Sequence, residues 1–524
     1  MKTLYSILTY TLVAAALTGA ISGCDKKLEK DPKAKLTPDS YYRTQNDLNA
    51  AVAGMYVALA RDGAWGFTSK MTSYFGSDDL TTDPGLNKGD FREFDRLSGS
   101  SSNGSMPNQW DGPWLAIYNA NGIITNYDQV PAVLPAEVAA KNESAGNAYF
   151  IRAITYYYLV RTFGPLPIVT GPVDAFTSLP RKGVDSVYAL VVSDLQKAKT
   201  LLPPDKKQGK PNSFAASALL ADVFLTMAGW PLNKPENYAL SATEAKNVMQ
   251  SGKYDVTTPY AQVFTTNHSS ESIFALEYSV AGNIPNRAFG STSVPLEEAA
   301  RSNNTGWDDF YPEINFYLNA PACPRTDATF YTTIKLRTGA APNFTWTLVP
   351  WNDPSTNARH PYYKKFRQGL VDGTGKADGV QETATTIEDM QPSTNKETTV
   401  IRYPAVLLNF AEASAMAGGG PTAESYAAVN QVRTGAGLPN LTPGLSQTAF
   451  RDSVVFERAY EFAGEFGVRW FDIVRLQLLP KVVAARNPIE NSIPTGTDFT
   501  KKYLAPIPFR EMSLNPEWKQ NDGY

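Results

Sequence analysis

The clearest helical pattern in the chain lies near its C-terminus, at residues 451–475. Apolar residues recur there at intervals of four, three and four, which is the spacing of one helix face, at Val455, Ala459, Phe462 and Phe466. Glutamates recur at intervals of four on another face, at Glu457, Glu461 and Glu465. The pattern predicts a helix that Gly467 ends, followed by a shorter helix, because glycine tolerates the left-handed conformation common at helix ends.

The three glutamates allow two interpretations. Glycosidases use two carboxylates about 5–10 Å apart, but they need them on opposite sides of a bond, whereas residues four apart on a helix point the same way. Three arginines are close enough in sequence to neutralise the stripe of glutamates: Arg458, Arg469 and Arg475. We therefore interpret Glu457, Glu461, Glu465 and Arg469 as a structural charge network. No catalytic residues are predicted, and the chain is not expected to be an enzyme.

Further helices are predicted along the rest of the chain. Asn46 is the expected N-cap of the first. A tyrosine-rich helix is expected over 142–163 and an amphipathic one over 185–202. Residues 212–254 and 407–432 each read as a helix pair with small residues where two helices would touch, typical of tetratricopeptide-like hairpins.

Two long stretches lack a helical period, at 61–113 and 266–400. Both are rich in Gly, Ser and aromatic residues, and the second contains strand-like pieces at 273–278 and 345–349. A structureless loop of this length is rare inside a compact domain, so we interpret 266–400 as a second, irregular lobe on the helices. The tail, 503–524, is expected to be extended.

The N-terminus carries a targeting signal. Lys2 and a short apolar run precede Ile21-Ser22-Gly23-Cys24, which is similar to a bacterial lipobox. Residues 1–23 are predicted to be a lipoprotein signal peptide, and Cys24 is the predicted site of lipidation. Residues 24–45, charged and proline-punctuated, would tether the lipid to the fold.

Composition narrows the classes of function. The 48 basic and 51 acidic residues leave a net charge of −3, without a clustered basic face, so nucleic acid is not an expected partner. The two histidines, His268 and His360, have no cysteine or carboxylate in ligand spacing, so we predict no metal site and no cofactor. Asp78, Asp79 and Asp83 lack the spacing of a calcium loop. With Cys24 lipidated, Cys323 is left without a disulfide partner.

Several of these stretches together resemble the SusD/RagB family of nutrient-binding outer-membrane lipoproteins from Bacteroidetes. The resemblance covers nearly the whole chain and depends on the order of the motifs behind the lipobox. The matching blocks are Arg152-Ala153 with Tyr156 to Arg161, Leu407 to Ala413, Asn430 to Arg433, Glu457-Arg458, Arg469 to Asp472, and Tyr503 to Pro508 with Asn515-Pro516. One departure is Phe466, which stands between Glu465 and Gly467 where the family commonly has an acid directly before the glycine.

The resemblance implies a mostly α fold: a right-handed superhelix of tetratricopeptide-like helix pairs with an irregular loop-rich lobe carrying short β pieces. On this basis residues 46–265 are expected to form an N-terminal helical scaffold with 61–113 as a binding loop. Residues 266–400 would form the irregular lobe, and 401–524 the C-terminal repeats and tail. The resemblance also implies a surface-exposed binding protein that delivers a nutrient, most often a glycan, to a SusC-like TonB-dependent transporter.

The matching motifs belong to the scaffold, so the ligand residues must be chosen from the loops. Aromatic rings cover the apolar face of a sugar, and neighbouring polar groups bond its hydroxyls. The candidates are Trp65, Asp79, Arg92, Trp110, Trp307, Trp346 and Trp351. The two loop regions are expected to meet and form one shallow site. Each tryptophan would alternatively staple its loop to the scaffold.

Two other functions remain open. The same scaffold would serve a binder of peptides or another non-glycan nutrient. The second alternative is a helical-repeat assembly protein that binds no small ligand.

Overall fold

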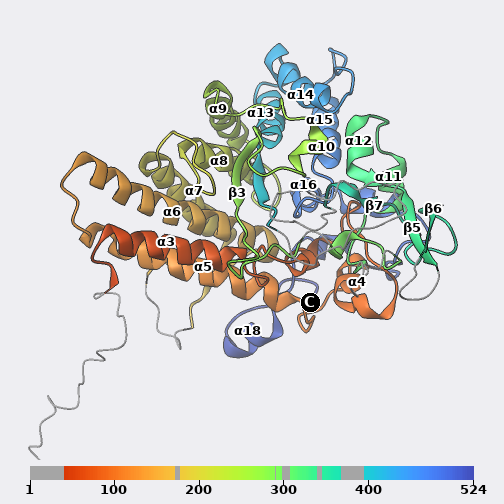
Figure 1. The fold of residues 1–524 in the computed structure, drawn as a ribbon, viewed down its shortest axis with the longest axis horizontal. Coiled ribbons are helices and arrows are strands. Elements are labelled where there is room, and N and C mark those ends of the chain that lie inside the picture. Colours follow the sequence, from red (N-terminus) through yellow and green to blue (C-terminus); the bar gives the residue numbers. More distant parts are fainter. Residues whose placement is uncertain (1–40, 172–177, 289–290, 298–306, 339–344, 367–394) are drawn as a thin grey trace, which may run out of the picture.

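The structure, a computed structural model, describes residues 41–171, 178–288, 291–297, 307–338, 345–366 and 395–524. The fold is mostly helical, with a few short two-stranded sheets, as the sequence predicts (Figure 1). The predicted signal peptide, the lipidation site Cys24 and most of the tether lie outside the described residues. Among the described helices, none has both the length and the apolar character needed to cross a membrane.

The N-terminal scaffold consists of long helices that pack side by side: α3 (Gln45–Ala60), α5 (Met106–Asn126), α6 (Pro135–Phe163) and α7 (Val184–Leu201). α6 contacts each of the other three, and its tyrosine-rich half is buried. It begins seven residues before the prediction, at 135 instead of 142, because Pro135 favours a helix start and the first turns are exposed and lack an apolar pattern. The N-cap of α3 is Thr44 and not Asn46, since Thr44 and Asp47 form a capping box.

Both predicted helix pairs are confirmed. The first is α8 (Ser213–Ala228) with α9 (Asn237–Gln250), and the second is α13 (Tyr403–Ala417) with α14 (Ala423–Gly435). α13 contacts α8 and α9 as well as α14, so it joins the two pairs into one core. α15 (Gln447–Glu461) also packs on α13 and leads into α16 (Val468–Arg475).

The turn between α15 and α16 differs from the prediction. α15 ends at Glu461 and not at Gly467, so Glu465 lies beyond the helix. Gly464, Phe466 and Gly467 all have positive φ, and Gly467 (φ 85°) is the N-cap of α16. A Cβ at Gly467 would lie 2.6 Å from the ring of Tyr74, so both the conformation and the space require glycine.

The region 61–113 is less irregular than the sequence predicts. It contains the 3₁₀ helix η2 (Thr68–Tyr74), η3 (Leu86–Lys88), the helix α4 (Gly89–Asp95) and the beginning of α5. The periodicity is lost because these helices are short and buried on several sides. A two-stranded ribbon, β1 (Leu166–Pro167) with β2 (Arg181–Lys182), follows α6, and η4 (Tyr127–Gln129) precedes it.

The predicted strand pieces of the irregular lobe are confirmed. β3 (Ser272–Leu276) pairs antiparallel with β8 (Thr398–Arg402), and β5 (Thr333–Thr338) pairs with β6 (Thr345–Pro350). The short helix α10 (Tyr260–Val263) precedes β3. Between β3 and β8 lie further short elements: η5 (Ser291–Ser293), α11 (Ile314–Leu318), α12 (Pro324–Thr329), β4 (Phe330–Tyr331), β7 (Tyr362–Tyr363) and η6 (Lys364–Phe366). Figure 1 shows α11, α12, β5 and β6 together at one end of the molecule, away from α6 and α7.

The C-terminal part is not wholly extended. It contains α17 (Leu479–Ala484), η7 (Phe499–Lys501) and α18 (Phe509–Leu514). The tail lies against the N-terminal scaffold, because Ala505 N donates to Thr162 O and Trp518 Nε1 donates to Leu179 O. These contacts bring the end of the chain back to α6.

Candidate functional site

The two loop regions meet in the structure, as expected. Thr81 and Tyr311 form an antiparallel bridge, and Lys88 forms an ion pair with Asp309. The Asn357 side chain donates to the carboxylates of Asp83 and Asp308, the second at 3.0 Å. Residues far apart in the sequence therefore form one continuous loop face.

A partly exposed aromatic pair lies where these regions meet. Phe67 and Trp307 have ring centroids 6.1 Å apart in an edge-to-face arrangement. The Arg287 guanidinium lies over both rings, 5.0 Å from the Phe67 centroid and 5.8 Å from that of Trp307. Arg287 also forms an ion pair with Asp62, and its backbone N–H donates to Gly66 O at 2.9 Å. The two rings and the Arg287 and Asp62 side chains are all partly open to solvent. A ligand would therefore meet apolar ring surface and polar atoms side by side.

A groove of about 610 Å³ lies on the same loop face. It is lined by Thr82, Pro84, Glu297, residues 355–360 and residues 489–491. A hydrogen bond links its lining to the segment of the aromatic pair: Asn357 donates to Asp308, a buried residue that follows Trp307. Burial raises the pKa of Asp308 to about 7.

Three of the predicted ligand residues are buried and do not offer a surface to a ligand. Trp110 is on helix α5 and not in a loop; it is 3% exposed and packs against Trp114, Phe163 and Trp518. Trp65 packs on Tyr158 with ring centroids 4.7 Å apart. Both tryptophans anchor their segments to α6, which is the alternative role that the sequence left open.

Asp79 is buried and is used within the fold. Its carboxylate accepts hydrogen bonds from Ser77 Oγ at 2.5 Å and from Gly464 N at 2.8 Å, and burial raises its pKa to about 6. Arg92 is partly buried and donates to the carbonyls of Asp83 and Gly85, so it holds its own loop. These interactions leave neither side chain directed at a ligand.

The remaining two predicted tryptophans lie apart from the aromatic pair. Trp351 is half-buried and packs edge-to-face on Tyr317 with ring centroids 6.1 Å apart. The Trp346 side chain lies outside the part of the structure that is described. Trp307 is thus the one predicted tryptophan that the described structure places in the exposed aromatic pair. Phe67 and Arg287 were missed because only their tertiary position distinguishes them from other loop residues.

The glutamate stripe lies in buried ion pairs. Arg325 Nη1 contacts Glu457 at 2.5 Å and Glu461 at 3.0 Å, and Arg402 contacts Glu461, Glu465 and Glu271. The partners of the stripe come from the irregular lobe, from β8 and from α14, where Arg433 contacts Glu457 at 2.7 Å, and not from the neighbouring arginines. Arg469 does not pair with the stripe: it binds Asp78 with two contacts of 2.6 Å each. Arg458 and Arg475 instead contact Asp472.

Phe466, the departure from the family pattern, contacts a buried lysine. Lys70 Nζ lies 3.5 Å from the centroid of the Phe466 ring and donates to Trp65 O at 3.0 Å. Lys70 is 1% exposed, and burial holds its pKa well below the usual range. The additional phenylalanine therefore packs its ring against the amino group of this lysine.

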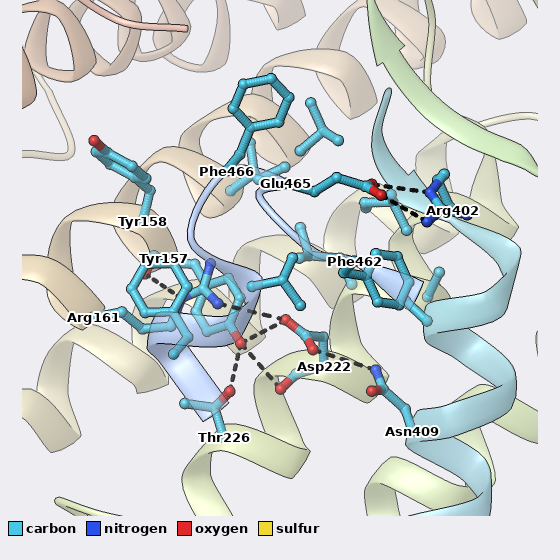
Figure 2. Close-up of a pocket in the computed structure, with 18 of the residues that line it drawn as sticks. Tyr157, Tyr158, Arg161, Asp222, Thr226, Arg402, Asn409, Phe462, Glu465 and Phe466 are labelled. Carbon is cyan, nitrogen blue, oxygen red and sulfur yellow. Dashed lines mark hydrogen bonds and ion pairs between the residues drawn. The ribbon is translucent and has the colours of Figure 1, made fainter. Parts of the chain in front are cut away.

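A second cavity lies between the helices (Figure 2). Figure 2 shows Tyr157, Arg161, Asp222 and Asn409 on one side and the Arg402–Glu465 pair on another. Its volume is about 110 Å³, less than a fifth of that of the groove. Tyr157 Oη donates to Asp222 Oδ2 at 2.8 Å, and Asn409 Nδ2 donates to Asp222 Oδ1 at 3.3 Å. Its polar groups bind one another, and its size suits several water molecules rather than an oligosaccharide.

Comparison with known proteins identifies the family. The model described as "SusD family" matches residues 270–524, and the model described as "Starch-binding associating with outer membrane" matches residues 28–225. SusD-like protein P2 of Formosa agariphila is 28% identical to this chain, with 98% of this chain and 99% of that protein covered.

Solved structures agree with the fold. A SusD homolog from Bacteroides thetaiotaomicron has a TM-score of 0.76 at 20% identity, covering 93% of this chain and 98% of the other. The surface glycan-binding protein A from Bacteroides uniformis has a TM-score of 0.71 at 20% identity, covering 91% and 99%. The resemblance inferred from the motifs is confirmed, and so is the expectation of a binding protein rather than an enzyme. The chain belongs to the SusD family.

Proposed function

We propose that this protein binds an oligosaccharide on its loop face for import. The observation that carries the proposal is the partly exposed Phe67–Trp307 pair with Arg287 and Asp62 beside it. The rings would cover the C–H face of a sugar, and the charged pair would bond its hydroxyls. The neighbouring groove would extend the site to further sugar units, since Asn357 in its lining is hydrogen-bonded to Asp308, the residue after Trp307. Trp351 and Trp346 remain candidates for ligand contacts.

Family relationship supports the same proposal. One matching family is described as starch-binding, and one similar structure is a surface glycan-binding protein. A peptide or another non-glycan nutrient is the alternative occupant of the same face. The exposed aromatic pair favours a sugar, because stacking on a ring requires a flat apolar surface that a peptide site does not need.

Replacing Trp307 by alanine is expected to weaken glycan binding without unfolding the protein. An aromatic contact contributes about 0.5–1.5 kcal/mol beyond area burial, so its loss should raise Kd roughly twofold to tenfold. Calorimetry against a panel of soluble polysaccharides, including starch and β-glucans, measures the effect, and Phe67→Ala is expected to act in the same direction.

The matched control for this substitution is Tyr118→Ala. Tyr118 is an exposed aromatic residue (65%) on α5, outside both loop regions, so its removal is expected to leave glycan affinity unchanged. Wild-type affinity in both loop variants, with melting curves intact, would place the sugar on another face. Binding of peptides but of no polysaccharide would favour the alternative nutrient.

The proposed location is the cell surface, held to the outer membrane by lipid on Cys24. The Ile21-Ser22-Gly23-Cys24 sequence supports it, as does the outer-membrane association in the family description. Cys24→Ser is expected to fold normally but to lose acylation, because serine lacks the thiol that carries the lipid. Without its acyl chains the protein would lose its stable membrane anchor. Fractionation with a labelled fatty acid measures this: a substituted chain that still takes up label and stays with membranes would refute lipidation.

The proposed partner is a SusC-like TonB-dependent transporter, which would receive the bound nutrient. Family membership supports this partner. Purification from native membranes in mild detergent is the test: the transporter should co-purify in a fixed ratio. Recovery of the protein alone, from membranes that contain the transporter, would contradict the partnership.

A further inference from the structure

Three ligand-type side chains converge at the base of the irregular lobe. Glu277 directly follows β3, and Glu397 directly precedes β8; the adjacent residues Leu276 and Thr398 are register partners. His268 reaches the same point from the loop before β3. The two carboxylates therefore stand where the chain enters and leaves the lobe.

The distances fit a shared cation. His268 Nδ1 lies 3.4 Å from Glu277 Oε1 and 3.2 Å from Glu397 Oε2, and one ligand atom from each residue lies within 4.8 Å of the others. Metal–ligand bonds of about 2.0–2.1 Å in a tetrahedral zinc site place neighbouring ligand atoms about 3.3 Å apart. The two distances from His268 Nδ1 to the carboxylate oxygens already have this length. A small rotation of the exposed Glu277 side chain would shorten the third distance, between the oxygens of Glu277 and Glu397.

The hydrogen bonding of Glu397 points to the same ligand. Its Oε1 accepts from His268 N at 3.0 Å and from Thr399 Oγ1 at 3.2 Å. Its Oε2 accepts no hydrogen bond from any residue that the structure describes. Water cannot easily replace the missing donor, because the side chain is only 1% exposed. A buried carboxylate oxygen without a donor is costly unless a cation binds it.

The surroundings hold these groups in place and leave one side open. Asn267 Oδ1 accepts from Glu397 N at 3.2 Å, which ties the histidine loop to β8. The nearby ammonium groups of Lys206 and Lys396 donate to backbone carbonyls of the same loop region, at Ser269 and at Thr266. The His268 and Glu277 side chains are 32% and 40% exposed, so an ion and a water ligand would have access from solvent.

We propose that His268, Glu277 and Glu397 bind a divalent transition-metal ion of the zinc class. The imidazole nitrogen selects such an ion over Ca²⁺ and Mg²⁺, which prefer oxygen ligands alone. Three protein ligands leave a fourth position for water. The ion would fix the two chain segments at the base of the lobe and so hold the loop face against the helices. This site departs from the prediction of no metal site, which could not anticipate it because 129 residues separate His268 from Glu397.

The test is calorimetry of the tag-free protein with ZnCl₂ and with CaCl₂. We expect one equivalent of zinc, no calcium, and at least a tenfold weaker zinc affinity in His268→Asn and in Glu277→Gln. Asparagine suits position 268 because its φ is 59°, a conformation that asparagine tolerates. Glu424→Gln, which changes an exposed glutamate paired with Lys246, is the control and should bind zinc as wild type does.

Cobalt provides a second readout, since Co²⁺ in a tetrahedral protein site absorbs visible light and in water is almost colourless. A visible band in wild type that is lost in both variants would support the site. Absence of zinc binding would overturn the proposal. Equal zinc affinity in wild type and both variants, with circular dichroism unchanged, would also overturn it, as would a preference for calcium.

Discussion

Replacing Arg402 by alanine is expected to destabilise the protein by at least about 3–5 kcal/mol, because it leaves buried carboxylates without their cation. Arg402 Nη1 donates to Glu271 Oε2 at 2.6 Å and to Glu461 Oε1 at 2.8 Å, and Nε and Nη2 bind both oxygens of Glu465. Its side chain is 1% exposed, so water cannot replace these contacts. The free energy of unfolding from chemical denaturation measures the loss.

A surface arginine provides the control for this substitution. Arg510 pairs with Asp111 and Glu511, but its side chain is 61% exposed, so Arg510→Ala is expected to cost less than about 1 kcal/mol. A free energy of unfolding within 1 kcal/mol of wild type for Arg402→Ala would mean that the network is hydrated and adds little. That result would also reopen a catalytic interpretation of the glutamate stripe.

Replacing Trp110 by alanine is expected to reduce stability by about 3–5 kcal/mol, the usual cost of removing a large aromatic side chain from a core. Its ring lies against Phe163 at 5.0 Å and Trp114 at 5.5 Å between centroids, and it also contacts Trp518 of the tail. The substitution therefore loosens α5, the end of α6 and the C-terminus together. Thermal and chemical denaturation measure the effect.

The same variant distinguishes a core tryptophan from a ligand residue. Because Trp110 is buried, the folded fraction of Trp110→Ala is expected to bind glycan as wild type does, whereas Trp307→Ala changes affinity and not stability. A Trp110→Ala protein with wild-type stability and lost glycan affinity would reverse these two assignments.

The sequence by itself determined the main helices, the strand pieces and the family. Helix pairs with small residues at their contacts, strand pieces at 273–278 and 345–349, and a glycine in the left-handed conformation at 467 are all present in the structure. These features depend on periodicity and on backbone preference, which are local properties that a sequence records directly. The order of the motifs along the chain likewise indicated the SusD family.

Only the tertiary structure decided which side chains are exposed and which charges meet. Trp65, Trp110 and Trp307 all lie in or near the loop regions, yet two are in the core and one is in the exposed pair, because exposure depends on what packs from elsewhere in the chain. Arg469 binds Asp78 across 391 residues, not its neighbouring glutamates. His268, Glu277 and Glu397 meet only because β3 and β8 pair. Long-range contacts of this kind are set by the fold as a whole, so spacing along the chain cannot predict them.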